Sequence, residues 1–156
     1  MSLPKIPFTK TAYELMQTEF RRLQQLRQEA MERLKTAREM GDLSENGAYR
    51  YAKFELGSLG RQLRELRFKL KNGYVPIIKS GRNPADAIDF GSTVTVRDGE
   101  NFLTFLLVSQ YESDPAQNKL STESPIGRAV VGKRVGDVVK VKLPAGEREF
   151  EITHCL

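Results

Sequence analysis

Two carboxylates, Asp42 and Glu45, lie three residues apart in the stretch 41–47 (GDLSENG) of this 156-residue chain. Three basic residues flank the stretch, one before it and two after it: Arg38, Arg50 and Lys53. Acidic residues between basic ones are an unusual charge distribution for a simple connector. The pair could act together on a partner molecule, although each acid also has an ordinary role to weigh. Asp42 suits a turn, and Glu45 suits the first turn of a helix, where the helix dipole favours an anion.

The elements on both sides of the acidic stretch mirror one another. Apolar or small residues recur there in alternating steps of four and three, the heptad pattern of helices that pack along one seam. Before the stretch these positions are Met16, Phe20, Leu23, Ala30, Leu34 and Ala37, with Arg27 as an interruption. After it they are Tyr49, Ala52, Leu56, Leu59, Leu63, Leu66 and Leu70. Pairing them across Leu43 gives residue numbers that always add to 86. The pattern therefore predicts an antiparallel hairpin, an arm on the order of 40 Å long that carries the two acids at its tip.

The expected helix ends follow from capping signals. Thr11 and Glu14 form a capping-box pattern at the start of the first helix, which should end near Met40. Ser44 is the expected N-cap of the second helix, which should continue to about Lys71.

Two glycines, Gly57 and Gly60, interrupt the second helix and weaken it by roughly 1 kcal/mol each relative to alanine. They are either exposed positions or places where another surface approaches closely.

The periodicity changes to strand-like alternation from Phe90 onward. Strands are predicted at 90–97 and 102–110 around the turn signal Asp98-Gly99, weakly at 120–122, and at 137–143 and 147–154. Ser124-Pro125 is the N-terminal signal of a brief helix that closes at Gly132, and Gly127 is interpreted as a turn residue. An antiparallel sheet with one helix on a face makes the chain α+β. We expect an arm at 1–75, a linker at 76–89 and a C-terminal domain at 90–156.

Composition excludes several classes of protein. The net charge is +5, and residues 1–75 hold 15 Lys/Arg against 9 Asp/Glu, a net +6 that places the basic excess on the arm. A basic arm is either a solvated coiled-coil surface or a nucleic-acid footprint. No apolar run is long enough to span a membrane and no signal-peptide pattern begins the chain, so we expect a cytoplasmic protein. One Cys (Cys155) and one His (His154) cannot form a disulfide or a structural zinc site.

Two motifs resemble a known family. The first is residues 41–46 (GDLSEN) followed by Tyr49, and the second is residues 124–133 (SPIGRAVVGK). Both are similar to the signatures of the bacterial transcript-cleavage factors GreA and GreB, and the resemblance runs from about Phe8 to Ile152. It implies an accessory factor, not an enzyme, that binds bacterial RNA polymerase through an FKBP-like C-terminal domain. The coiled coil would enter the secondary channel of a backtracked complex.

The resemblance also implies a role for each candidate residue. Asp42 and Glu45 help to hold the second catalytic Mg²⁺ and to position the attacking water. Arg38, Arg50 and Lys53 contact the nascent RNA 3′ segment. Ser124 and Pro125 contact the polymerase. Mg²⁺ keeps most of its waters and binds poorly to one or two carboxylates alone, so the acids are expected to complete a two-metal site in the polymerase.

Some features leave other functions open. The family usually has Glu-Asn-Ala, an acid and Tyr where this chain has Glu45, Asn46, Gly47, Ala48 and Tyr49. The missing acid at Ala48 keeps open a non-cleaving regulator that occupies the same channel. An FKBP-like sheet also suggests a prolyl isomerase, but the aromatic residues of the C-terminal half are mostly at positions expected to fill the core. Direct duplex binding by the basic arm would weaken steeply with salt.

Overall fold

The computed structural model describes residues 5–40, 46–77, 83 and 85–156. Residues Lys10–Tyr74 form one compact unit, and Val75–Leu156 form the second together with Ile6–Thr9. Two strands of two residues each, β1 (Ile6–Pro7) and β2 (Gly73–Tyr74), are also present. Within these described ranges, no helix combines the length and the apolar character needed to cross a membrane.

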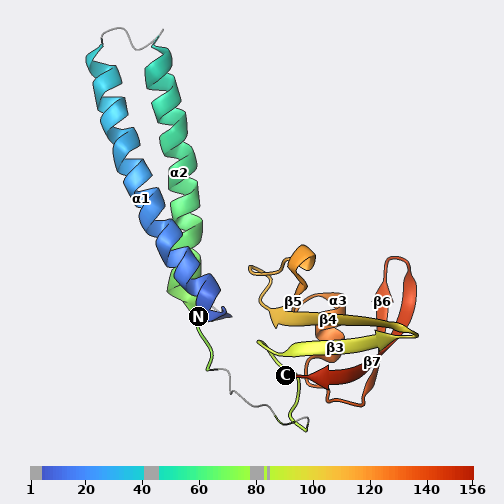
Figure 1. Cartoon of the computed structure of the whole chain (residues 1–156). Helices are drawn as coiled ribbons and strands as arrows, with labels where there is room; N and C mark the ends of the chain where they lie inside the picture. Colours follow the sequence, from blue (N-terminus) through green and yellow to red (C-terminus); the bar gives the residue numbers. More distant parts are fainter. Residues whose placement is uncertain (1–4, 41–45, 78–82, 84) are drawn as a thin grey trace. The chain divides into compact units, whose positions relative to one another are not determined.

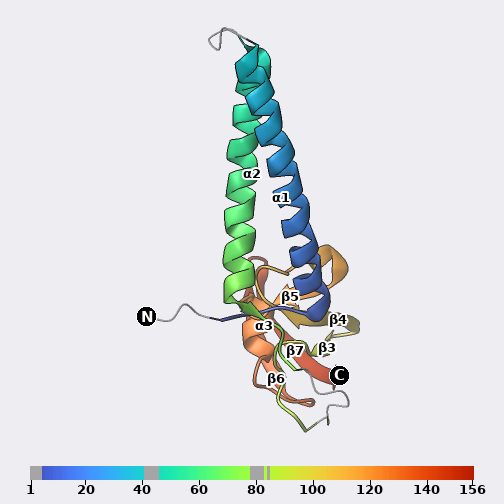
Figure 2. The ribbon, with the colours of Figure 1, turned by 90° about the vertical axis from the view of Figure 1, so that its left-hand side faces the viewer.

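The first unit is an antiparallel helical hairpin, with α1 (Lys10–Glu39) and α2 (Gly47–Asn72) side by side in both views (Figures 1 and 2). With 30 residues at about 1.5 Å each, α1 is about 45 Å long. The six buried side chains of the hairpin all lie at predicted seam positions: Leu23, Ala30, Ala37, Ala52, Leu59 and Leu63. The heptad prediction is therefore confirmed.

Contacts between the two helices fix their register. The Tyr13 hydroxyl donates to the carbonyl oxygen of Leu70 at 3.2 Å. Farther along the arm, Arg33 pairs with Glu55 at 2.7 Å between guanidinium and carboxylate. The residue numbers of these pairs add to values close to the predicted 86, so the two helices pair in nearly the predicted register.

The predicted N-cap residues of both helices were wrong. The first helix begins at Lys10, which places Thr11 inside the first turn and not at the N-cap. The preceding Thr9 is held outside the helix, because its backbone N–H and hydroxyl both donate to the carboxylate of Glu112. The second helix begins at Gly47, with Asn46 as its N-cap in place of Ser44. Asn46 caps both helix ends at once, as described below. Glu45 lies outside the described residues, so its predicted place in the first turn stays a prediction.

The second unit is a five-stranded sheet of order β5-β4-β3-β7-β6. The strands are β3 (Thr93–Asp98), β4 (Asn101–Val108), β5 (Lys119–Ser121), β6 (Val138–Leu143) and β7 (Gly146–Cys155). A single 3₁₀ turn, η1 (Pro115–Gln117), precedes β5, and the short helix α3 (Pro125–Val130) follows it. Both predicted hairpins and the α+β class are confirmed.

One strand pair differs from the predicted antiparallel sheet. Strand β5 runs parallel to β4, with Leu107 opposite Leu120. Parallel neighbours need a connection that carries the chain back along the sheet. Residues 109–118, which include η1, provide that connection. The sheet is therefore mixed.

The core of the second unit lies between the sheet and α3. Its buried members are Ile88, Val94, Val96, Phe105, Leu107, Val130, Val139, Val141, Phe150 and Ile152. Phe105 and Phe150 fill this core, as expected from their strand positions, whereas Phe102 is exposed. Ile88, from the stretch expected to be a linker, is only 1% exposed. Backbone hydrogen bonds with Gly132 and Lys133 hold it there.

Candidate functional site

The tip of the arm is held by one side chain. Asp42 and Glu45 themselves lie outside the described residues, but the helix ends on both sides are described. The Asn46 carboxamide oxygen accepts from the backbone N–H of Tyr49 at 3.1 Å, which caps α2. Its amide nitrogen donates to the carbonyl oxygen of Ala37 at 2.7 Å, in the last turn of α1. The oxygen is thus paired with a donor of α2 and the nitrogen with an acceptor of α1. Asn46 therefore clamps the two helix ends together at the base of the acidic stretch.

A basic cluster surrounds an aromatic ring just below this clamp. The guanidinium carbon of Arg38 lies 5.9 Å from the centroid of the Tyr49 ring, and the Lys53 ammonium nitrogen lies 6.0 Å from it. Both distances are within the range of a cation–π interaction. Arg50 is the next residue after Tyr49 in the first turn of α2, where its backbone N–H bonds to Asn46. The structure thus brings Arg38 and Lys53 together at Tyr49, and places Arg50 beside that cluster in sequence.

The described helix ends carry basic side chains near the tip. No acidic side chain occupies the first turn of α2, and Arg38 is the basic residue in the last turn of α1. In the described part of the chain, no group of three or more His, Cys, Asp or Glu side chains is arranged to hold a metal ion. That search does not include Asp42 and Glu45, so their predicted role as Mg²⁺ ligands stays a prediction.

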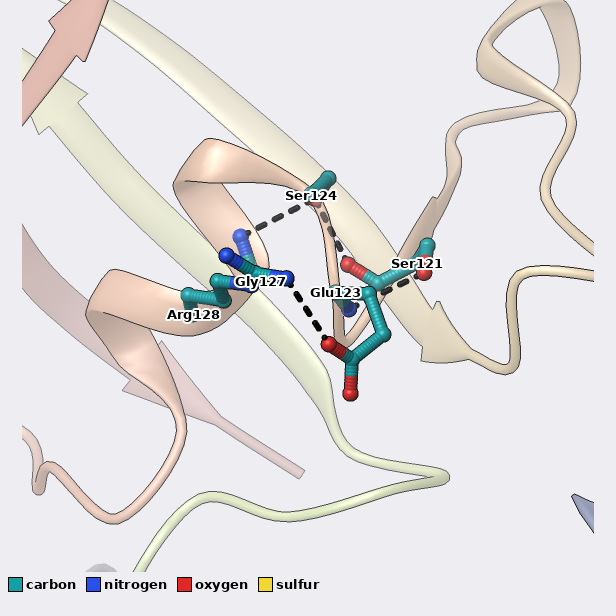
Figure 3. A network of polar contacts seen from close by, with 5 residues as sticks. All are labelled: Ser121, Glu123, Ser124, Gly127 and Arg128. Atoms are coloured by element: carbon teal, nitrogen blue, oxygen red, sulfur yellow. Dashed lines mark hydrogen bonds and ion pairs between the residues drawn. The ribbon is translucent and has the colours of Figure 1, made fainter.

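The second motif begins at the turn that leads into α3 and continues through that helix (Figure 3). The Ser124 hydroxyl accepts from the backbone N–H of Gly127 at 3.1 Å and donates to the carbonyl oxygen of Ser121 at 2.6 Å. Ser124 is therefore the N-cap, and Pro125 takes the first helical position, as predicted. Because both functions of the hydroxyl are used within the chain, the chemical role of Ser124 is to hold the turn.

Gly127 was wrongly interpreted as a turn residue, since it lies inside α3 and is buried. A Cβ atom on Gly127 would lie 2.0 Å from the carbonyl oxygen of Ser121, far inside van der Waals contact. Helix α3 therefore packs against the backbone of residue 121 at a distance that only glycine allows.

The exposed side of the same turn consists of Pro125 and an ion pair. Arg128 and Glu123 lie 3.1 Å apart, and their side chains are 70% and 63% exposed. Such an exposed pair contributes little stability, so these groups remain available to a partner.

Sequence reasoning missed two of these features. Asn46 could have been found, because asparagine is among the best N-caps and stands three residues before Tyr49. The contact between Gly127 and Ser121 has no local signal, since it depends on how α3 packs against the strand that precedes it.

Comparison with known proteins agrees with both motifs. Residues 6–75 match the family model "Transcription elongation factor, N-terminal", and residues 83–156 match "Transcription elongation factor, GreA/GreB, C-term". The chain is 41% identical to the transcription elongation factor GreA of Pelobacter propionicus over 150 residues, which cover 94% of each chain. It is 42% identical to GreA of Thermosipho melanesiensis over 151 residues, again 94% of each.

A solved structure is also similar. The GreA factor homolog 1 of Thermus thermophilus is 28% identical, and the match covers 97% of this chain and 99% of that one with a TM-score of 0.45. The family assignment rests on the sequence matches, which extend over both units. They show that this chain belongs to the GreA/GreB family of transcription elongation factors.

Proposed function

We propose that this chain binds bacterial RNA polymerase and stimulates the polymerase's own cleavage of backtracked RNA. The arm enters the secondary channel, and the acidic stretch reaches the polymerase active site. The observation that carries the proposal is the architecture of the tip. In the sequence, two carboxylates lie between helix ends that Asn46 clamps together, at the end of a two-helix arm whose longer helix is about 45 Å long. A clamped base limits the positions that the two carboxylates can take.

Asp42 and Glu45 are the residues that hold a Mg²⁺ ion together with carboxylates of the polymerase. Carboxylate oxygens are the ligand type that Mg²⁺ prefers, and two of them are too few for a site within this chain alone. The bound metal supplies charge stabilisation at the scissile phosphate and a bound water of lowered pKa. The role of this chain is to deliver and orient the two oxygen ligands.

Arg38, Arg50 and Lys53 bind the nascent RNA 3′ segment through its phosphates. Arg38 and Lys53 share the Tyr49 ring, so their charges are held near one another and near the clamp. Arg50 extends from the first turn of α2 at the same level of the arm. A cluster of cations at this place can hold an extruded strand close to the acids.

The second unit binds the polymerase through the turn at Ser124 and Pro125. Ser124 acts indirectly, because its hydroxyl is engaged with Ser121 and Gly127. Pro125, Glu123 and Arg128 are the exposed groups that contact the polymerase surface.

In a second candidate function, the arm has the same architecture and enters the same channel, but it does not stimulate RNA cleavage. Ala48 is exposed in the first turn of α2, where the family usually has an acid. A tip with less negative charge could occupy the channel and slow nucleotide addition without cleaving RNA.

A cleavage assay separates these two functions. Elongation complexes of a cognate polymerase are stalled in a backtracked state, with RNA labelled at its 5′ end, and the protein is added. The proposed function predicts that the labelled RNA shortens, whereas Asp42→Ala and Glu45→Ala variants bind the polymerase and leave it intact. The second candidate predicts slower nucleotide addition and no shortened RNA with any of the three proteins.

A further inference from the structure

A hollow of about 870 Å³ lies between α1 and α2 along the arm. Five basic side chains from both helices line it: Arg27, Lys35, Arg38, Arg61 and Arg64. One carboxylate, Glu32, lines it as well. We call this surface the basic hollow. Its residues lie below the tip, and only Arg38 also belongs to the cluster at Tyr49.

The charges of the basic hollow are not neutralised within the described residues. None of its five cations forms an ion pair with a carboxylate of those residues. Arg33, which lines a different hollow of the arm, contrasts with them. The hydrogen bond from Arg33 to Glu55 raises the pKa of its guanidinium group above the ordinary value. The basic hollow therefore has a net positive charge, five cations against the carboxylate of Glu32, that is available to a partner.

The remaining lining residues of the basic hollow are largely aliphatic or small. Met31, Leu34 and Leu56 contribute apolar surface, and the Met31 side chain is 48% exposed. Gly57 and Gly60 also line it. A Cβ atom on Gly57 would meet nothing within 4 Å, and one on Gly60 would meet only the flexible end of Arg64 at 3.8 Å.

Two glycines inside a helix lower its stability. No close contact among the described residues requires them. Their effect is to leave the backbone of α2 open to close approach from outside. Gly57 is exposed, which agrees with the first interpretation that the sequence left open, and the space over it is also wide enough for a second surface.

The size and chemistry of the basic hollow fit one kind of occupant. From Arg27 to Arg38 is about 16 Å along α1, or three helical turns. An aliphatic floor between basic rims matches an amphipathic helix with an apolar stripe and acidic flanks. Surfaces that bind single-stranded nucleic acid combine basic residues with aromatic rings on which bases stack. None of the described residues that line this hollow is aromatic.

We propose that the basic hollow is a docking groove for an acidic amphipathic helix of a partner protein, about three turns long. The partner helix lies against α1 and α2, with apolar side chains over Met31, Leu34 and Leu56. Its carboxylates pair with the cations of the two rims. The proposal involves neither Asp42 nor Glu45, and it shares only Arg38 with the residues proposed to bind RNA.

The test uses the full chain and a synthetic peptide of about fourteen residues, locked as a helix by a lactam bridge. The peptide has leucines spaced i, i+3, i+4 and i+7 and glutamates on both flanks. A second peptide has lysine in place of every glutamate, and a single-stranded RNA of equal charge is the third ligand. Fluorescence anisotropy at low ionic strength measures the affinity of each.

Three variants accompany the wild type. The double variant Arg61→Glu/Arg64→Glu reverses charge inside the basic hollow. Arg21→Glu/Lys71→Glu makes the same change in net charge at residues outside it. Gly57→Gln fills the open space over α2 with a better helix former, so the arm keeps its helical melting temperature or gains a few degrees.

The proposal predicts that the acidic peptide binds and the lysine peptide does not. Arg61→Glu/Arg64→Glu and Gly57→Gln each weaken binding by about tenfold or more, and Arg21→Glu/Lys71→Glu weakens it less than about threefold. Three results would overturn it. These are no preference for the acidic peptide, equal loss in both charge-reversal variants, or RNA binding that is tighter and equally sensitive to Arg61 and Arg64.

Discussion

The side-chain amide of Asn46 donates a hydrogen bond of 2.7 Å to the carbonyl oxygen of Ala37, across the tip of the arm. The same side chain accepts from the backbone N–H of Tyr49. A single side chain thus forms hydrogen bonds with a carbonyl group in the last turn of one helix and with an N–H group in the first turn of the next. The two acids lie between these points in the sequence.

Replacement of Asn46 tests the clamp. Asn46→Ala removes both hydrogen bonds and should lower the stability of the arm by about 1–2 kcal/mol, the usual effect of losing an N-cap. Asn46→Asp keeps the acceptor for Tyr49 and loses the donor to Ala37, so its stability should be intermediate. Thermal unfolding followed by helical circular dichroism measures both. Equal stability of Asn46→Ala and the wild type would mean that the clamp has no energetic role.

Tyr49 should matter through its ring and not through its hydroxyl. Tyr49→Phe keeps the surface that Arg38 and Lys53 share, whereas Tyr49→Leu removes it. A cation–π interaction at an exposed site contributes about 0.5–1 kcal/mol, so Tyr49→Leu should weaken RNA engagement roughly two- to fivefold. The measurement is the factor concentration at half-maximal cleavage. If Tyr49→Phe and Tyr49→Leu lose the same amount, the ring does not organise the cations.

Gly127 should tolerate no side chain. Gly127→Ala places a Cβ atom 2.0 Å from the backbone oxygen of Ser121, and backbone cannot move aside as a flexible side chain can. We expect a loss of about 3 kcal/mol in the stability of the second unit. Gly57→Ala is the matched control, because its new methyl group meets open space and should stabilise α2 by about 1 kcal/mol. Hydrogen exchange of the β3 and β4 amides reports the first effect, and helix melting reports the second.

Substitutions at Ser124 and Pro125 should have different effects. The first should lower the stability of the turn, and the second should lower the affinity for the polymerase. Ser124→Ala removes the N-cap of α3 and should cost about 1 kcal/mol of stability. Pro125→Ala retains the cap and should change stability by less than about 0.5 kcal/mol, but it removes the exposed ring. Affinity for the polymerase should fall several-fold with Pro125→Ala, as measured by competition binding. An unchanged affinity would place the polymerase contact elsewhere on the second unit.

The arm could be predicted from the sequence because its burial is periodic. Leu23 and Leu63 are buried at positions where the heptads of both helices coincide, and no distant residue is needed to explain them. The start of α3 could be predicted for a different reason, since Ser124 and Pro125 form a local capping signal.

Two kinds of feature could not be predicted in this way. One is a choice between two residues that suit the same position, and the other is a contact between residues far apart in the sequence. Ser44 and Asn46 are both good N-caps, and only the bond from Asn46 to Ala37 on the other helix decides between them. The parallel pairing of β5 with β4 follows from the path of the connection between them, which has no periodicity. Asp42 and Glu45 lie outside the described residues, so the predicted metal site rests on their residue types and their place in the chain.

Asp42 and Glu45 are proposed to supply metal ligands to an active site in the polymerase. The most direct test of this role is the rate of RNA cleavage in backtracked complexes as a function of Mg²⁺ concentration, with wild type, Asp42→Asn and Glu45→Gln at saturating factor. These variants keep the size of each side chain and remove its charge. Loss of groups that merely support metal ligands costs 10- to 100-fold, so loss of a ligand should slow cleavage by about 100-fold or more and raise the Mg²⁺ requirement. Cleavage by both variants at the wild-type rate and Mg²⁺ dependence would contradict this role.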